Sequence, residues 1–306
     1  MFPAEITRRG ILTSGPSLAA AGVMLPIVVP TRAMAAAPKV DFEDPKERAR
    51  FRARITGPSI EEHVHSYTKL HIYGYMNDGN MIPFFTLLNY AHSFWKPDAD
   101  GMTYSATAFE CGVYCQFGTE EPLDVWENPV TGEKREVWQF LGGPLKIKVG
   151  PEGSITDENA TVKPQTMPME IIGDYFYMPQ QSSFKFPNPL SPDKYPSESA
   201  GRMFFWDSHF TYSVPLDDLA GQSTPRAKTA VQYVNMVTWH PWIGMGNRPG
   251  KTIGRAYGAK LKSLDDLPVN VRKAVEAKTP EVFDTDHWTA FRDDIGLYVK
   301  QRIETK

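Results

Sequence analysis

Strand-like runs of aromatic and β-branched residues follow one another from residue 61 to residue 238, with no helical pattern between them. These residue types favour β-strands, and the glycines and prolines between the runs favour turns. A parallel sheet needs a helix between successive strands, so this order of runs favours an antiparallel sheet. We therefore expect a mainly β protein with roughly seven to nine strands, curled into a barrel or packed as a sandwich.

Six runs predict strands on their own: residues 63–75, 81–90, 103–117, 169–178, 201–214 and 229–238. Pro83 places the second run at a sheet edge or a bulge, because proline cannot donate to a ladder. Residues 123–149 predict a hairpin with its turn at 127–133. The proline-rich residues 179–199 predict a long loop, and residues 151–168 form a polar stretch of ambiguous structure.

Helical spacing occurs on either side of the strand-rich region. At residues 41–55, Asp44 can cap a helix and Pro45 suits its first turn. We expect the many charges of that helix to face solvent. Residues 263–279 and 284–303 repeat apolar side chains at helical spacing, which predicts two C-terminal helices.

The first 35 residues have the pattern of an export signal. Arg8 and Arg9 precede a mildly apolar run at residues 17–29, which is shorter than the stretch of about 20 residues that spans a membrane. Ala-x-Ala spacing allows cleavage after Ala35 or Ala37. The arginine pair resembles a twin-arginine signal, and an ordinary secretory signal or an uncleaved anchor is the alternative.

We accordingly expect a twin-arginine signal peptide at residues 1–35 and an exported, periplasmic protein that uses the twin-arginine export machinery as a partner. Residues 36–306 contain no linker or internal repeat, so they predict a single β-rich domain with C-terminal helices. No stable membrane span is expected, and a homo-oligomer stays open.

Composition and motifs exclude several functions. A net charge of −3 gives no basic surface for nucleic acid. Cys111 and Cys115 lie too far apart on a strand for a disulfide, so both are expected to be small buried residues. The glycines at 244–254 do not have the order of a phosphate-binding loop, and no Gly-x-Ser-x-Gly elbow occurs. We therefore expect no cofactor.

The stretch 237–255 is the strongest candidate for a functional loop. It combines a histidine, tryptophans and arginines with many glycines and prolines: Trp239, His240, Trp242, Arg248 and Arg255. His240 can serve as an acid or base, the arginines can bind a carboxylate or phosphate, and the tryptophans can stack on an aromatic ligand. The alternative is structural, with the tryptophans closing one end of a barrel and the arginines paired to acidic neighbours.

A second candidate lies on the strand at 201–214. Asp207 and His209 share one face, where a carboxylate can orient a histidine for general-base work. Trp206 is a candidate wall of the substrate site, and Tyr212 should point away from the pair. Glu110 and Glu127 are further candidate acids, although Glu127 can instead support its turn.

His63, His65 and His71 share one face of the first strand. A His-x-His pair can supply two metal ligands, which makes a metalloprotein an alternative. No acidic or cysteine cluster at metal-ligand spacing accompanies the pair, so the leading interpretation has no metal.

Three stretches resemble one family: residues 126–133 (Trp-Glu-Asn-Pro-Val-Thr-Gly-Glu), 201–206 (Gly-Arg-Met-Phe-Phe-Trp) and 239–246 (Trp-His-Pro-Trp-Ile-Gly-Met-Gly) with Pro249 and Gly250. Together they resemble domain-of-unknown-function family 1838, over about residues 45–285, whose members often carry a twin-arginine leader. This resemblance implies no catalytic residue. A looser similarity to calycin-type, lipocalin-like barrels implies a ligand in the barrel mouth.

The sequence thus predicts an exported calycin-like protein that binds a small aromatic or apolar molecule and acts on it by cofactor-independent acid–base chemistry. A lyase, decarboxylase or isomerase suits such a site, and lignin-derived aromatics are one substrate class. His240, Asp207 and His209 are the candidate acid–base groups. Trp206, Trp239, Trp242, Arg248 and Arg255 are the candidate binding residues. A non-catalytic periplasmic binding protein is the alternative.

Overall fold

The computed structural model describes residues 43–156, 165–166, 169–220, 224–285 and positions 298, 301, 303 and 304. The predicted signal peptide and most of the predicted helix at 284–303 lie outside the described residues. Among the helices of the described part of the chain, none is long and apolar enough to cross a membrane.

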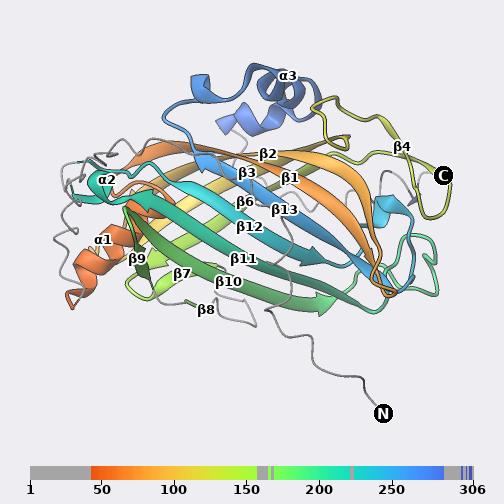
Figure 1. The fold of residues 1–306 in the computed structure, drawn as a ribbon, viewed down its shortest axis with the longest axis horizontal. Coiled ribbons are helices and arrows are strands. Elements are labelled where there is room, and N and C mark those ends of the chain that lie inside the picture. The colour runs from red at the N-terminus through yellow and green to blue at the C-terminus, as the bar shows by residue number, and fades with distance from the viewer. Residues whose placement is uncertain are drawn as a thin grey trace, which may run out of the picture. The chain divides into compact units, whose positions relative to one another are not determined.

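The described residues confirm a mainly β fold. Eleven antiparallel strands form one sheet that curls into a half-barrel (Figure 1). In spatial order the strands are β7 (Gly153–Thr156), β6 (Phe140–Gly150), β3 (Tyr104–Gln116), β2 (Met81–Pro97), β1 (Glu62–Met76), β13 (Gly250–Lys260), β12 (Ala230–Val237), β11 (Met203–Pro215), β10 (Tyr175–Pro187) and β8 (Gln165–Thr166), with β9 (Glu170–Ile172) also paired to β10.

The strand order divides the sheet into two meanders. Strands β1, β2, β3, β6 and β7 run outward from the centre on one side, and β8, β10, β11 and β12 run inward on the other. Strand β13, the last in the chain, lies between β1 and β12 and pairs with both. The sheet is therefore continuous only through β13.

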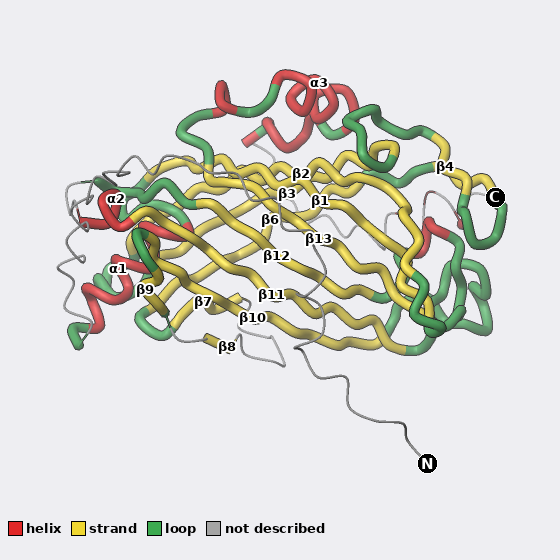
Figure 2. The backbone as a smooth tube through the Cα atoms, viewed as in Figure 1, coloured by secondary structure: helices red, strands yellow, loops and turns green. Residues whose placement is uncertain are grey.

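Short helices accompany the sheet, as the tube trace shows (Figure 2). They are α1 (Pro45–Thr56), α2 (Leu216–Ala220), α3 (Val269–Lys278) and the 3-10 helices η1 (Pro241–Ile243), η2 (Leu264–Asp266) and η3 (Pro280–Phe283). The predicted helix at 263–279 is therefore two helices, η2 and α3. Pro268 separates them, because proline disfavours helical backbone in the residue before it.

Alternate side chains of each strand point to opposite faces of the sheet. The convex face carries α3 (Figure 1), and Val271 of α3 shares a buried cluster with Leu88 and Tyr90 of β2. The concave face lies inside the curl, where Leu70 and Leu87 belong to a second cluster. Each strand therefore contributes one set of residues to each face.

Helix α1 closes one end of the half-barrel. Its start is confirmed, because the Asp44 carboxylate accepts a hydrogen bond from the Lys46 amide at 2.8 Å. The expectation that all its charges face solvent is wrong. Arg52 and Arg54 are only 7% and 3% exposed, because the sheet covers α1 on the side of Arg52 and the α2 region covers it on the side of Arg54.

The opposite end is closed by what we call the end cap, the β4–β5 hairpin together with residues 239–246. Strands β4 (Val125–Glu127) and β5 (Lys134–Glu136) confirm the predicted hairpin and form a separate small sheet. Trp126 packs on Trp242 with ring centroids 5.8 Å apart, and the Asn128 Nδ2 group donates to the Ile243 carbonyl at 2.9 Å.

Two predicted loops contain strands. Strand β10 continues to Pro187 inside the predicted loop 179–199, because it lies beside the sheet edge, where prolines are tolerated. Strand β13 begins at Gly250 inside the predicted loop 237–255. Its glycines fit crowded positions, since a Cβ on Gly258 would lie 2.0 Å from the Tyr67 carbonyl oxygen. Pro83 lies beside a bulge in the β1–β2 ladder, as predicted.

Candidate functional site

Aromatic side chains line part of the concave face. They form a band, called the aromatic row below, along β10 and β11: Phe184, Phe186, Phe204, Trp206, Phe210 and Tyr212. Phe184 stacks on Trp206 with centroids 5.8 Å apart, and Phe186 stacks on Phe204 at 5.0 Å. Phe184 remains 37% exposed, so the row presents aromatic surface to solvent. Such a surface suits a flat apolar ligand.

A group of polar side chains lies beside this row on the concave face. This polar centre comprises Glu110 of β3, Asn89 of β2, Thr68 of β1 and Tyr233 of β12. The Thr68 hydroxyl lies 3.4 Å from the Tyr233 hydroxyl and 3.5 Å from the Asn89 Nδ2 atom. Tyr233 also packs on Phe210 at 4.9 Å, which connects the polar centre to the aromatic row.

Two acceptors in the polar centre lack partners. The Asn89 Oδ1 atom is buried without a hydrogen bond. Within the described residues, the Glu110 carboxyl has neither a hydrogen bond nor an ion pair. Buried polar groups are normally satisfied, so unpaired acceptors on an inner face point to a place for a ligand or water. This makes the polar centre a better candidate for chemistry than a region in which all polar groups are paired.

Electrostatics favour neutral forms in this region. Burial raises the pKa of the Glu110 carboxyl, so its proton is retained to higher pH than usual. Burial, with the nearby Glu110 as a second cause, also raises the pKa of Tyr212 to about 12. Burial is also the main cause of the raised pKa of Tyr233. At neutral pH both tyrosine hydroxyls are therefore hydrogen-bond donors.

His240 lies at the junction between the aromatic row and the end cap. Its ring meets Phe204 edge-on at 6.4 Å, and it lines a cavity of about 20 Å³ with Trp242 and Tyr114. Burial lowers the pKa of His240 to about 4, so the imidazole is neutral at pH 7. Neither ring nitrogen hydrogen-bonds within the described residues, so His240 remains available to a ligand.

The predicted pair Asp207 and His209 lies on the convex face of β11, whereas Trp206 lies on the concave face. The Asp207 Oδ1 atom accepts hydrogen bonds from the Ser183 hydroxyl and, at 3.4 Å, from Gln181. His209 is exposed. In the part of the chain that the structure describes, no hydrogen bond joins Asp207 to His209. The sheet thus separates this pair from the aromatic row.

The predicted binding residues of the 237–255 stretch also separate. Trp239 and Trp242 are 2% and 3% exposed in the end cap, the arrangement given above as the structural alternative. Arg248 is exposed and donates to the Met245 carbonyl at 3.0 Å. Arg255 lies on the convex face over the Tyr73 ring at 5.7 Å. Neither arginine has a contact with the aromatic row among the described residues.

The histidines of β1 lie on the convex face. The His63 Nδ1 atom is 3.1 Å from the His92 Nε2 atom, and the His65 Nδ1 atom is 2.8 Å from the Tyr90 hydroxyl. Within the described residues, no group of three or more histidine, cysteine, aspartate or glutamate side chains is arranged to hold a metal ion.

Thr68, Asn89 and Tyr233 are not predicted from the sequence, and Glu110 is predicted only as a candidate acid without a position. Alternation along the strands is the signal that could have placed them, since Glu110 and Tyr212 occupy concave positions of their strands. What alternation does not reveal is which strands lie opposite each other in the curl.

The three stretches that resemble a known family converge at one end of the molecule. Asn128 of the first stretch hydrogen-bonds Ile243 of the third. The amide of Phe205 in the second stretch donates at 2.8 Å to the hydroxyl of Thr238, the residue directly before the third. No curated protein matches the chain. The family described as "Protein of unknown function (DUF1838)" matches residues 64–297, and the chain therefore belongs to that family.

Proposed function

We propose that this protein binds a small aromatic molecule on the concave face of the half-barrel and acts on it by acid–base chemistry. One observation carries the proposal: an unpartnered carboxyl, Glu110, lies beside a half-exposed band of aromatic rings. The rings supply apolar contact area, and the carboxyl supplies a proton donor or acceptor.

The roles follow from the surroundings of each group. A carboxyl with a raised pKa keeps its proton to higher pH than usual, so it can donate that proton to a substrate and recover it later in the reaction. The hydroxyls of Tyr212 and Tyr233 can stabilise negative charge that develops on a substrate oxygen. His240, neutral at pH 7, is a second candidate acid–base group at the end of the aromatic row. Elimination, decarboxylation, carbon–carbon lysis and isomerisation all need such groups.

Export belongs to the same proposal. Arg8, Arg9 and the Ala-x-Ala motif ending at Ala35 support a twin-arginine leader and a periplasmic location. Protein recovered from the periplasm of an expressing bacterium is thus the right material for the assay, and its mass reports where the leader was removed.

The test uses a panel of phenolic, lignin-derived aromatics. Binding is followed by tryptophan fluorescence, because Trp206 lies in the aromatic row, and turnover is followed by mass spectrometry of the products. We expect Glu110→Gln to lower turnover by roughly 100-fold or more while binding changes only a few-fold. Glu127→Gln is the matched control, since Glu127 is exposed on the end cap.

Equal turnover by Glu110→Gln and the parent protein would remove Glu110 from the chemistry. The two groups suited to proton transfer, Glu110 and His240, have no contact with each other among the described residues. That separation favours one alternative, a periplasmic binding protein without catalysis. It is supported if the panel binds with no product formed by any variant.

A further inference from the structure

Arg52 of α1 is a buried cation without an acidic partner. Its side chain is 7% exposed, its Nε atom donates to the Pro151 carbonyl at 3.0 Å, and its Nη1 atom lies 3.7 Å from the Met178 sulfur. In the described residues no carboxylate forms an ion pair with it. A thioether is a weak acceptor, so most of the donor capacity of the guanidinium is unused.

Burying an unpaired charge is costly, and proteins normally pair it. The acid whose charge acts on Arg52 is Glu152, but Glu152 is 86% exposed and bonds Arg48 at 2.7 Å. Arg54, its buried neighbour on α1, differs because it donates to the Thr224 hydroxyl at 3.0 Å and to the Asp218 carbonyl. Among the described residues, Arg52 thus has a free binding capacity for an anion that no carboxylate fills.

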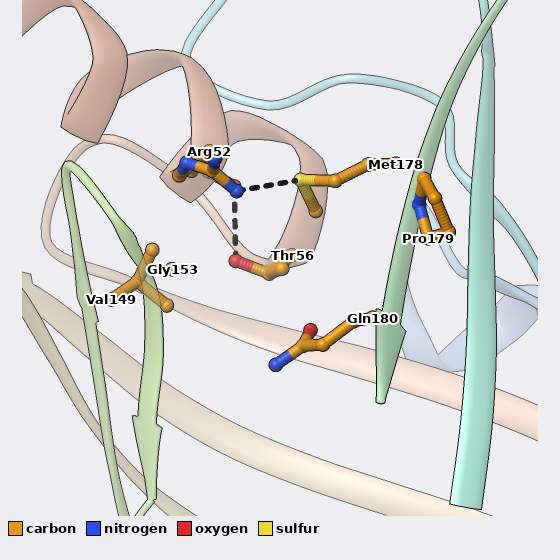
Figure 3. A pocket seen from close by; sticks show the side chains of 7 residues that line it. All are labelled: Arg52, Thr56, Val149, Gly153, Met178, Pro179 and Gln180. Carbon is orange, nitrogen blue, oxygen red and sulfur yellow. Dashed lines mark hydrogen bonds between the residues drawn. The ribbon is translucent and has the colours of Figure 1, made fainter. Parts of the chain in front are cut away.

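A cavity adjoins the Arg52 guanidinium, bordered by Thr56 of α1, Gln180 of β10 and Gly153 of β7 (Figure 3). Its volume of about 10 Å³ accepts a single water-sized group. It therefore has room for one oxygen atom of a ligand beside the guanidinium. Within the described residues, the Gln180 amide has no hydrogen-bond partner, so it can also bind that oxygen.

The cavity lies at the end of the aromatic row. Met178 and Gln180 are concave residues of β10, and they pair in register with Tyr212 and Phe210 of β11. A carboxylate seated at Arg52 would thus be followed along the concave face by aromatic side chains. The arrangement matches a ligand with an anionic end and an aromatic body.

We propose that Arg52 binds the carboxylate of an aromatic acid whose ring lies along the aromatic row. This inference rests on the proposed function, because it names the substrate class of the same concave site. Arginine suits the role, since its planar guanidinium stays charged when buried and forms strong, charge-assisted hydrogen bonds to carboxylate oxygens. The anion-binding residue is then Arg52 of α1, in place of the predicted Arg248 and Arg255.

The experiment measures calorimetric binding of benzoate, phenylacetate and 3-phenylpropanoate, each against its neutral amide. We expect the best acid to bind about 10- to 100-fold more tightly than its amide. Arg52→Gln should abolish that preference while affinity for the amide stays within about two-fold. Arg54→Gln is the matched control, which should keep the preference for the acid.

Three other outcomes would contradict the proposal. Equal binding of acids and amides to the parent protein, or a preference that survives in Arg52→Gln, overturns the role of Arg52 and leaves the proposed function intact. Absence of binding by every acid and amide overturns both. If Arg52→Gln fails to fold, Arg52→Met is used instead, since a buried apolar side chain of similar length removes the charge without leaving a polar group unpaired.

Discussion

Three histidine side chains gather on the convex face under η3. The rings of His65 and His92 are 4.4 Å apart, and His63 lies within hydrogen-bond distance of His92. Burial and, to a smaller extent, the neighbouring His65 and His63 lower the pKa of His92 to about 4. Burial is also the main cause of the lowered pKa of His65. The folded protein therefore holds the His65 and His92 rings neutral at pH 7.

This predicts acid sensitivity of the fold. A histidine whose folded pKa lies below its unfolded value of about 6.5 costs stability as the pH falls, because the unfolded chain binds the proton first. We expect the free energy of unfolding to decrease between pH 6.5 and pH 4, with His92 contributing on the order of 3 kcal/mol. Urea unfolding at a series of pH values measures the slope.

His92→Leu separates this contribution from that of the carboxylates. The variant should lose less stability than the parent protein across the same pH interval, whatever its stability at pH 7. Identical pH slopes for the two proteins would show that His92 is not held neutral by the fold.

Single charged residues illustrate what sequence patterns fail to reveal. Arg52 stands among seven other charged residues of the 43–54 stretch and was expected to face solvent, yet it is buried. Arg255 was expected in a binding loop, yet it lies exposed on a strand. Exposure of a long polar side chain depends on which element packs over it, and that contact comes from a remote part of the chain.

At the scale of elements, the end cap depends on one turn residue. Asn128 is fully buried, its Nδ2 atom donates to the Ile243 carbonyl, and its Oδ1 atom accepts from the Val130 amide at 2.8 Å. It therefore both shapes the β4–β5 turn and attaches that hairpin to the 239–246 segment.

Asn128→Ala should lower the free energy of unfolding by about 2–4 kcal/mol, because buried backbone donors and acceptors lose their partners. Thermal unfolding followed by circular dichroism measures the loss. Glu127→Ala, next to it and exposed, should change stability by about 0.5 kcal/mol or less. A comparable loss in both variants would contradict the proposed role of Asn128.

Most elements could be predicted because their signals are local. The cap of α1 at Asp44 and the hairpin around Asn128 follow from a few neighbouring residues. Strand β13 could not be predicted, because Gly254 and Gly258 are residues typical of loops and the reason for a glycine there lies in contacts with other strands. A Cβ at Gly254 would lie 2.2 Å from the Asn235 side chain, which belongs to another strand.

At the scale of the molecule, Lys260 connects the last strand to the first helix. Its Nζ atom donates to the carbonyls of Arg54, Ile55 and Gly57 at 2.7, 3.1 and 2.8 Å. These carbonyls lie at the C-terminal end of α1, where a helix has unpaired acceptors and favours a positive charge.

Lys260→Met should therefore lower the free energy of unfolding by about 3 kcal/mol and expose α1 to protease before the sheet. Urea unfolding and limited proteolysis, with the cleavage sites read by mass spectrometry, measure both effects. Lys262→Met is the control, since that side chain is exposed and should leave both unchanged. Cleavage of the sheet before α1 would show that Lys260 does not hold the helix.

The candidate site is formed by the whole curved sheet, so the sequence predicts only parts of it. The aromatic strand with Trp206 and the acid Glu110 were both named from the sequence, but as unrelated features. They belong to β11 and β3, which are separated in the sheet by β2, β1, β13 and β12. Alternation places both on the concave face, and the curvature of the sheet brings Glu110 near Tyr212 of the aromatic row.

The position of β13 also has a consequence for the order of assembly during synthesis. The ribosome produces both meanders before it produces the strand that connects them, so the ladder edges of β1 and β12 wait unpaired until residue 260 has emerged. Such long-range pairing is slow, and exposed edges invite association with other chains. Nascent molecules of this protein are thus expected to depend on chaperones up to the last stage of translation, and to mature as a unit once the final strand is inserted.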